Sequence, residues 1–164
     1  QSVGAVGEIK RGLREKEDQK GAYYCSFPSF IDIYHVIGRM MERNGISVYI
    51  MLCTLTDKNG EIRMGTDRNK EASKALKIAI CNSLRRGDFY TRYNESQFLV
   101  MLSGTTLESC QVVSARIDRN FKKDFAGHFR INYYMASVAE LREEREEDPI
   151  LFTSAGDCWG NTRK

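Results

Sequence analysis

Residues 46–56 constrain the fold of this chain most strongly, because they form a long apolar run that is rich in β-branched side chains. Such a run is typical of a strand that is covered on both faces of a sheet. It is followed by Asp57-Lys58-Asn59-Gly60, in which Asn-Gly is a signal for a tight turn. We therefore expect residues 46–56 to form a central strand, with a short hairpin near residues 61–64.

Three other segments carry apolar residues at helical spacing and predict helices at about residues 28–44, 67–86 and 105–124. Pro28 opens the first and Asn44-Gly45 ends it. Gly87 is expected to close the second, and the third begins with a threonine cap. Each apolar stripe is interpreted as core rather than as a ligand site. The stripes are Phe30, Ile33, Tyr34, Ile37, Met40 and Met41; Ala75, Leu76, Ala79, Ile80 and Leu84; and Leu107, Cys110, Val113, Ile117 and Phe121.

The composition is that of one soluble globular domain with tails, with 164 residues, 41% hydrophobic and 29% charged. No apolar run approaches the length of a membrane span, and no leader peptide is recognisable. We therefore predict a cytoplasmic protein without membrane contact. The net charge of +3 comes from 25 basic residues scattered among 22 acidic ones, so direct nucleic-acid binding is not expected.

The cysteines and histidines predict neither a metal centre nor a catalytic centre. The five cysteines are dispersed without a Cys-x-x-Cys pair, and the only histidines are His35 and His128. A zinc site needs ligands at closer spacing. We interpret the cysteines as reduced, mostly buried thiols.

A polar turn separates two further apolar runs at Arg92-Tyr93-Asn94-Glu95-Ser96-Gln97-Phe98. This heptapeptide resembles the Arg-Tyr-Gly-Gly-Asp/Glu-Glu-Phe signature of the GGDEF family, the bacterial diguanylate cyclases. Upstream, Arg85 and Asp88 resemble the family's Arg-x-x-Asp element at the family spacing. The resemblance covers roughly residues 28–139.

The resemblance implies an α/β (α+β) fold of the ferredoxin-like palm type, similar to nucleotidyl cyclases. A mainly antiparallel, five-stranded central sheet would carry flanking helices, with the motif at a hairpin tip. Besides the central strand and the short hairpin, the expected strands are residues 89–93, 97–102 and 130–138. Residues 1–27 would be a charged and aromatic linker or entry segment, packed against the domain at residues 22–27, and residues 140–164 a charged tail.

The motif departs from the family at the positions that carry the chemistry. In the family the glycines let the hairpin approach the guanine nucleotide, and the acidic residue at the third motif position helps to hold the metals. Here Asn94 and Glu95 fill the glycine positions, and Ser96 and Gln97 fill the acidic ones. The added Cβ atoms crowd the approach, and neutral side chains do not supply the anionic oxygens that Mg²⁺ requires. Thr54 stands where the family's first strand ends in a metal-binding aspartate, so no catalytic residue, metal or cofactor is predicted.

The Arg-x-x-Asp element leaves two interpretations open. In active family members this site binds cyclic-di-GMP as a feedback inhibitor, and Arg85, Asp88 and Arg116 match its positions. Their forked guanidinium groups suit phosphate and guanine edges. The structural alternative is favoured, because an arginine in a last helical turn offsets the helix dipole and Gly-Asp is common turn chemistry.

Three functional hypotheses follow. The preferred one is a catalytically inactive regulatory or protein-interaction domain of a larger bacterial signalling or transcription-regulatory protein. Its partners would be other domains of the same chain or a second protein. The alternative is a cyclic-di-GMP receptor that uses the Arg-x-x-Asp site. An active nucleotide cyclase, or an enzyme with altered chemistry, is least favoured because no other acid, base or nucleophile cluster is visible.

Overall fold

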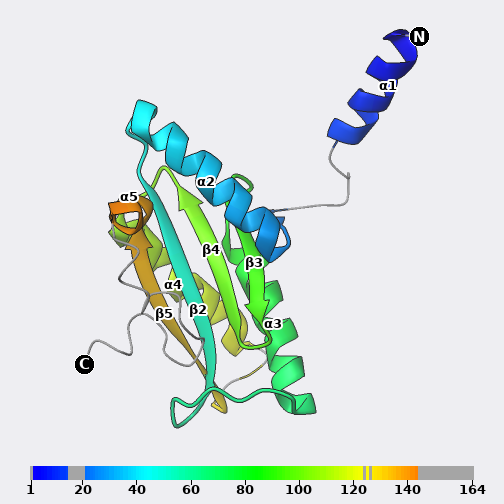
Figure 1. Ribbon diagram of the computed structural model, residues 1–164. Coiled ribbons are helices and arrows are strands. Elements are labelled where there is room, and N and C mark those ends of the chain that lie inside the picture. The colour runs from blue at the N-terminus through cyan, green and yellow to red at the C-terminus, as the bar shows by residue number, and fades with distance from the viewer. Residues whose placement is uncertain (1, 15–20, 124, 126, 144–164) are drawn as a thin grey trace.

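A five-stranded sheet forms the centre of the computed structural model, which describes residues 2–14, 21–123, 125 and 127–143 (Figure 1). The strand order is β1-β3-β4-β2-β5, in which β1 runs parallel to β3 and all other neighbours are antiparallel. The strands are β1 Tyr23–Tyr24, β2 Val48–Asp57, β3 Phe89–Asn94, β4 Gln97–Ser103 and β5 Phe129–Ser137. The predicted α+β fold with a mainly antiparallel sheet is confirmed.

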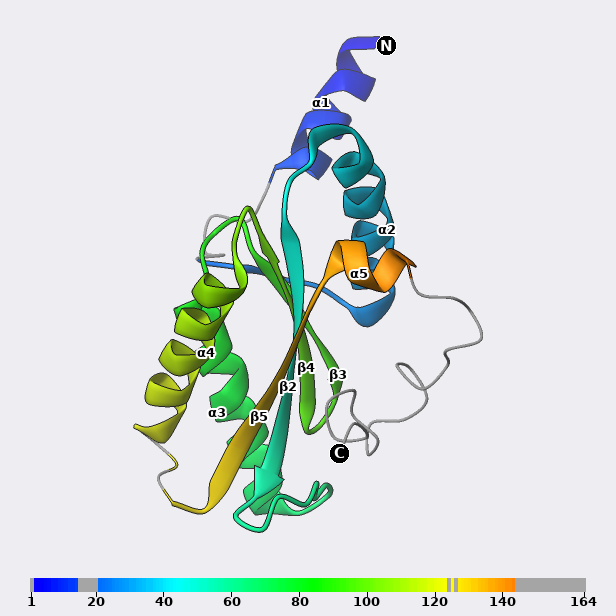
Figure 2. The same ribbon diagram turned by 90° about the vertical axis from the view of Figure 1, so that its left-hand side faces the viewer.

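Helices cover both faces of this sheet. Figure 2 shows α2 (Phe27–Asn44) and α5 (Val138–Glu143) on one face, and α3 (Asp67–Ser83) and α4 (Leu107–Lys122) on the other. The further helix α1 (Ser2–Leu13) exposes its apolar residues Val6, Ile9 and Leu13. Among the described residues, no helix is both long and apolar enough to cross a membrane.

The central position predicted for residues 46–56 is confirmed, because β2 lies between β4 and β5. Its side chains alternate between two cores. Met51, Cys53 and Leu55 pack in the core beneath α3 and α4, whereas Ile50 and Leu52 pack in the core beneath α2. This two-sided burial explains why the run is apolar throughout rather than alternating.

The fifth strand was placed wrongly at residues 61–64, which form no strand. The Asp57 carboxylate closes this segment into a loop instead, accepting hydrogen bonds from the Asn59 and Glu61 amides at 2.8 and 3.0 Å. The fifth strand is β1, whose Tyr23 amide donates to the Asp88 carbonyl at 3.0 Å. The expectation that residues 22–27 pack against the domain is confirmed.

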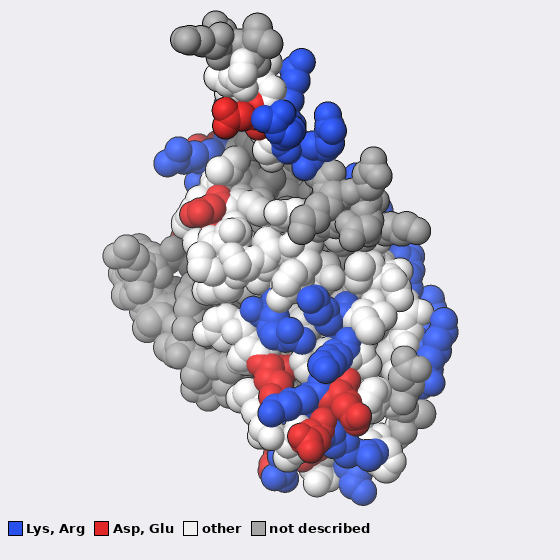
Figure 3. Space-filling model, turned by 90° about the vertical axis from the view of Figure 1, so that its right-hand side faces the viewer, with Lys and Arg blue, Asp and Glu red and all other residues white. Residues whose placement is uncertain are grey.

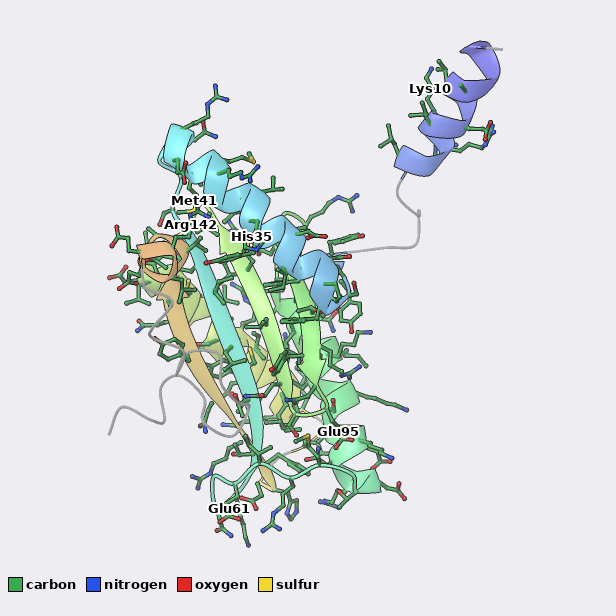
Figure 4. The ribbon with its side chains drawn as sticks, in the orientation of Figure 1. Lys10, His35, Met41, Glu61, Glu95 and Arg142 are labelled. Atoms are coloured by element: carbon green, nitrogen blue, oxygen red, sulfur yellow. The ribbon has the colours of Figure 1, made fainter. Side chains whose placement is uncertain are left out.

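The packed unit also includes α5, beyond the limit predicted at residue 139. The Arg142 guanidinium of α5 lies over Gly38 of α2 and pairs with Glu42 at 2.6 Å (Figure 4). A Cβ at Gly38 would stand only 2.8 Å from the Cδ and Cζ atoms of Arg142, so the glycine leaves the space that the Arg142 side chain occupies. The rest of the predicted tail, residues 144–164, lies outside the described residues.

Helix α3 ends at Ser83 rather than at residue 86, and Gly87 lies in a turn after it. Side chains of α4 bind this end of α3, because Arg116 donates to the Ser83 carbonyl at 2.9 Å and Asn120 donates to the Ser83 hydroxyl at 2.8 Å. Two residues assigned to the core are instead exposed, namely Met40 and Leu107.

The hydroxyl of Thr91 in β3 provides a test of the core. It is fully buried and has no hydrogen-bond partner among the described residues. A buried hydroxyl without a partner is costly, so Thr91→Val should raise the free energy of unfolding by about 1 kcal/mol. Urea denaturation measures this change.

Thr54→Val is the matched control, since Thr54 is buried in the same sheet but accepts a hydrogen bond from Gln97. The same substitution should there lower the free energy of unfolding, because it leaves a buried amide without this acceptor. A loss of stability in Thr91→Val would show that its hydroxyl is satisfied.

Candidate functional site

The motif at residues 92–98 lies at the tip of the hairpin between β3 and β4, as expected. Glu95 and Ser96 form its turn, and the pairing shifts register between Arg92 and Asn94. The Asn94 side chain closes the turn, since it accepts from the Ser96 amide at 2.9 Å and donates to the Gln97 side chain at 3.0 Å. The described residues other than glycine all have negative φ, so this turn accommodates its Cβ atoms without backbone strain.

The Glu95 side chain ties the hairpin to the loop that precedes α3 (Figure 4). Its carboxylate accepts hydrogen bonds from the Gly65 amide at 2.9 Å and from the Asn69 side chain at 2.6 Å. These two bonds stabilise the charged form and hold the pKa of Glu95 below its ordinary value. The Glu95 carboxylate therefore has a structural role here.

Ser96 and Gln97 are buried beneath this tether, which the sequence did not reveal. The Ser96 hydroxyl donates to the Arg63 carbonyl at 2.8 Å and accepts from Asn69 at 3.2 Å. The motif is thus the centre of a polar network that joins β3, β4, the loop before α3 and α3 itself. Phe98, the last motif residue, is fully buried in the core beneath α3 and α4.

Thr54 stands at the strand position that the resemblance assigns to metal binding, and it lies beside Gln97, which fills the second acidic position of the motif. Thr54 of β2 faces Gln97 of β4 in the sheet register, and the Gln97 amide donates to the Thr54 hydroxyl at 3.1 Å. Both side chains are neutral and buried. Within the described part of the chain, no group of three or more His, Cys, Asp and Glu side chains is arranged to hold a metal ion.

A hollow of about 310 Å³ lies next to the tether, between the end of β2 and the start of α3. Arg63 at its edge is paired with Asp57 at 2.9 Å. The Glu61 amide and this guanidinium lower the pKa of Asp57. The hollow is lined by Asp57, Lys58, Asn59, Arg63, Thr66, Arg68, Asn69, His128 and Phe129.

The structure brings Arg85, Asp88 and Arg116 together at the end of α3, where protein groups bind each of them. The buried Asp88 carboxylate accepts from the Arg85 amide at 2.9 Å and pairs with its guanidinium at 3.4 Å. Arg85 also donates to the Ser103 carbonyl at 2.8 Å, and Arg116 is bonded to Ser83. A ligand would have to displace these contacts, and the proposed cyclic-di-GMP role of the trio stays a prediction.

Charges of both signs cover the face that carries β3 and α3. Figure 3 shows lysine and arginine side chains interleaved with acidic ones on this face. Exposed charged residues of α3 include Asp67, Arg68, Lys70, Glu71 and Lys74. The small net charge of the chain is therefore not gathered into one basic surface on this side.

The Glu95 tether should make stability depend on pH. A carboxylate with a lowered pKa in the folded state contributes stability above its ordinary pKa of 4.5, and loses it as the pH falls through the lowered value. Glu95→Gln should therefore be less stable than the wild type at about pH 7 and equal to it at about pH 2. Urea denaturation at both pH values measures the difference.

Glu71→Gln on the exposed surface of α3 is the control for this substitution. It should leave the free energy of unfolding at neutral pH unchanged. Equal stability of Glu95→Gln and the wild type at neutral pH would contradict the role of the tether.

The similarity of this chain to known proteins is one of fold. No protein-family model and no curated protein sequence matches the chain. Among the solved structures that resemble it, three have 11 to 14% identity. A DGC protein from Thermotoga maritima has 14% identity and a TM-score of 0.55, with 70% of this chain and 81% of that chain covered.

The other two come from Pseudomonas aeruginosa and Caulobacter crescentus. The diguanylate cyclase SiaD, in complex with its activator SiaC, has 13% identity and a TM-score of 0.54, covering 83% of this chain and 55% of that chain. The GGDEF domain of DgcB, in complex with c-di-GMP, has 11% identity and a TM-score of 0.57, with 76% of this chain and 80% of that chain covered. The chain therefore folds as a GGDEF-like domain.

Proposed function

We propose that this chain is a catalytically inactive GGDEF-like domain with a regulatory or protein-interaction role in a larger bacterial signalling or transcription-regulatory protein. The observation that carries the proposal is the hydrogen bond between Gln97 and Thr54. Two-metal nucleotidyl transfer needs carboxylates that hold the cations next to the triphosphate. A neutral amide and a neutral hydroxyl, bonded to each other, do not serve this purpose.

The hairpin tip adds a second obstacle to a nucleotide. The Glu95 carboxylate is held in its charged form by Gly65 and Asn69. A negative charge at this tip opposes the phosphates of an approaching nucleotide. The Asn94 side chain is bonded within the turn and the Ser96 hydroxyl is bonded to the Arg63 carbonyl, which favours a role for the motif in stability.

In this proposal the cyclase fold serves as a scaffold for contacts with other proteins. The complex of SiaD with its activator SiaC is one instance of a similar fold with a protein partner. The interleaved charges on the α3 face suit a protein contact better than nucleic acid, which requires a concentrated basic surface. The domain would transmit the state of its neighbours through contact rather than through a product.

The chain should not convert GTP to cyclic-di-GMP in the presence of Mg²⁺. Chromatography of the reaction mixture measures the product, with an active diguanylate cyclase such as SiaD as the positive control. Thr54→Asp combined with Gln97→Glu should remain inactive and be less stable, because two buried carboxylates would repel each other. Formation of cyclic-di-GMP by the wild-type chain would overturn the proposal.

A second candidate function is favoured by the convergence of Arg85, Asp88 and Arg116, and by the complex of the similar DgcB domain with c-di-GMP. Because these side chains already bind protein groups, we expect isothermal titration with cyclic-di-GMP to show no binding. Arg85→Ala is the test variant, and Arg86→Ala is its control with the same change of charge. Micromolar or tighter binding that Arg85→Ala alone abolishes would make this domain a second-messenger receptor.

A further inference from the structure

Among the described residues, β5 pairs with another strand along one edge only. The strand spans nine residues and pairs with β2 in continuous register. No strand of the described chain pairs with its other side, and Figure 2 shows this edge facing the viewer between the two helix layers. An open edge presents backbone donors and acceptors that another strand can bind.

The register identifies which backbone groups are free. In an antiparallel ladder, alternate residues direct both backbone groups to the same neighbour. The Leu55 amide donates to the Ser96 carbonyl, so the backbone groups of Leu55 point to the β4 side. The backbone groups of Thr54 and Thr56 therefore point to β5. There they face Asn132 and Arg130, respectively. The even-numbered residues of β5 therefore bond to β2, and the odd-numbered ones point outward.

The end of the strand supports this assignment independently. The Ser137 amide, which is odd-numbered, donates to the Glu140 carboxylate at 3.1 Å rather than to β2. The open edge thus consists of the backbone groups of Phe129, Ile131, Tyr133 and Met135.

The two edges of the sheet differ in their protection. At the opposite edge, β1 covers Phe89 and Tyr90, and the register shift after Arg92 interrupts the rest of β3. By contrast, β5 contains no proline, no glycine and no register shift, and Arg130 is its one charged residue. The usual devices that prevent edge pairing are absent from β5.

We propose that β5 is a dimer interface that pairs antiparallel with β5 of a second copy of this chain. The two-fold axis passes through Tyr133, so that Tyr133 faces Tyr133 of the second copy and Ile131 faces Met135 of the second copy. The outward groups of these residues would form about six backbone hydrogen bonds and join the two sheets. This proposal does not depend on the chemistry of the hairpin.

Charge complementarity favours a second copy as the occupant of this edge. In the proposed register, the exposed Arg130 faces Ala136 of the second copy, the residue that precedes its Ser137. Glu140 is bonded to the amide and hydroxyl of Ser137 at 3.1 and 2.9 Å, which places its carboxylate near Arg130 of the other copy. Two symmetric ion pairs would form, and no like charges would face each other across the strands.

Sedimentation velocity of the full chain over a range of concentrations tests the dimer. The wild type should dimerise, and Arg130→Glu should weaken dimerisation at least about tenfold, because it places two acidic groups together. Combining Arg130→Glu with Glu140→Arg should restore the dimer. Arg39→Glu on the exposed surface of α2 is the control with the same change of charge and should dimerise like the wild type.

Amide hydrogen exchange provides a readout that reports on the strand itself. The amides of Ile131, Tyr133 and Met135 should exchange slowly at concentrations that favour the dimer and fast on dilution, whereas those of Asn132 and Tyr134 should be slow in both. A chain that stays monomeric with fast exchange at the odd-numbered residues would overturn the proposal. Slow exchange of these residues in a monomer would also overturn it, since another part of the same chain would then cover the edge.

Discussion

The rest of the structure depends on β2, which is bonded at both edges and covered on both faces. Its register with β4 places Thr54 beside Gln97, and its register with β5 sets which groups of β5 point outward. The two cores meet across its backbone, because its odd-numbered side chains pack under α3 and α4 and its even-numbered ones pack under α2. A slip of one residue would exchange these two sets and disrupt both cores at once.

The polar network at the hairpin connects this framework to the proposed loss of catalysis. The side chains of the motif are bonded to neighbouring segments: Glu95 to Gly65, Ser96 to Arg63 and Gln97 to Thr54. Buried polar groups must be paired, and here they are paired internally. The motif thereby stabilises the end of the sheet. The outer edge of β5, at the side of the sheet, is the separate surface that we propose for assembly.

Most of the fold was predictable from local signals. The central strand, the hairpin and three of the helices follow from apolar periodicity, caps and turn residues, and their limits were off by only a few residues. The misplaced fifth strand shows where such signals fail. Residues 61–64 carry no signal that the Asp57 carboxylate will fold them into a loop, and the short β1 exists only because β3 lies beside it.

The sequence by itself determined that the neutral residues Ser96 and Gln97 stand at the positions where the resemblance places acidic ones. It did not determine what the replacements do. The tertiary structure decided that Thr54 bonds to Gln97 and that Arg116 bonds to Ser83. It also decided that no strand of the described residues pairs with the outer edge of β5. The physical reason is that these contacts join segments distant in sequence, and strand order and register alone bring such segments within hydrogen-bond distance.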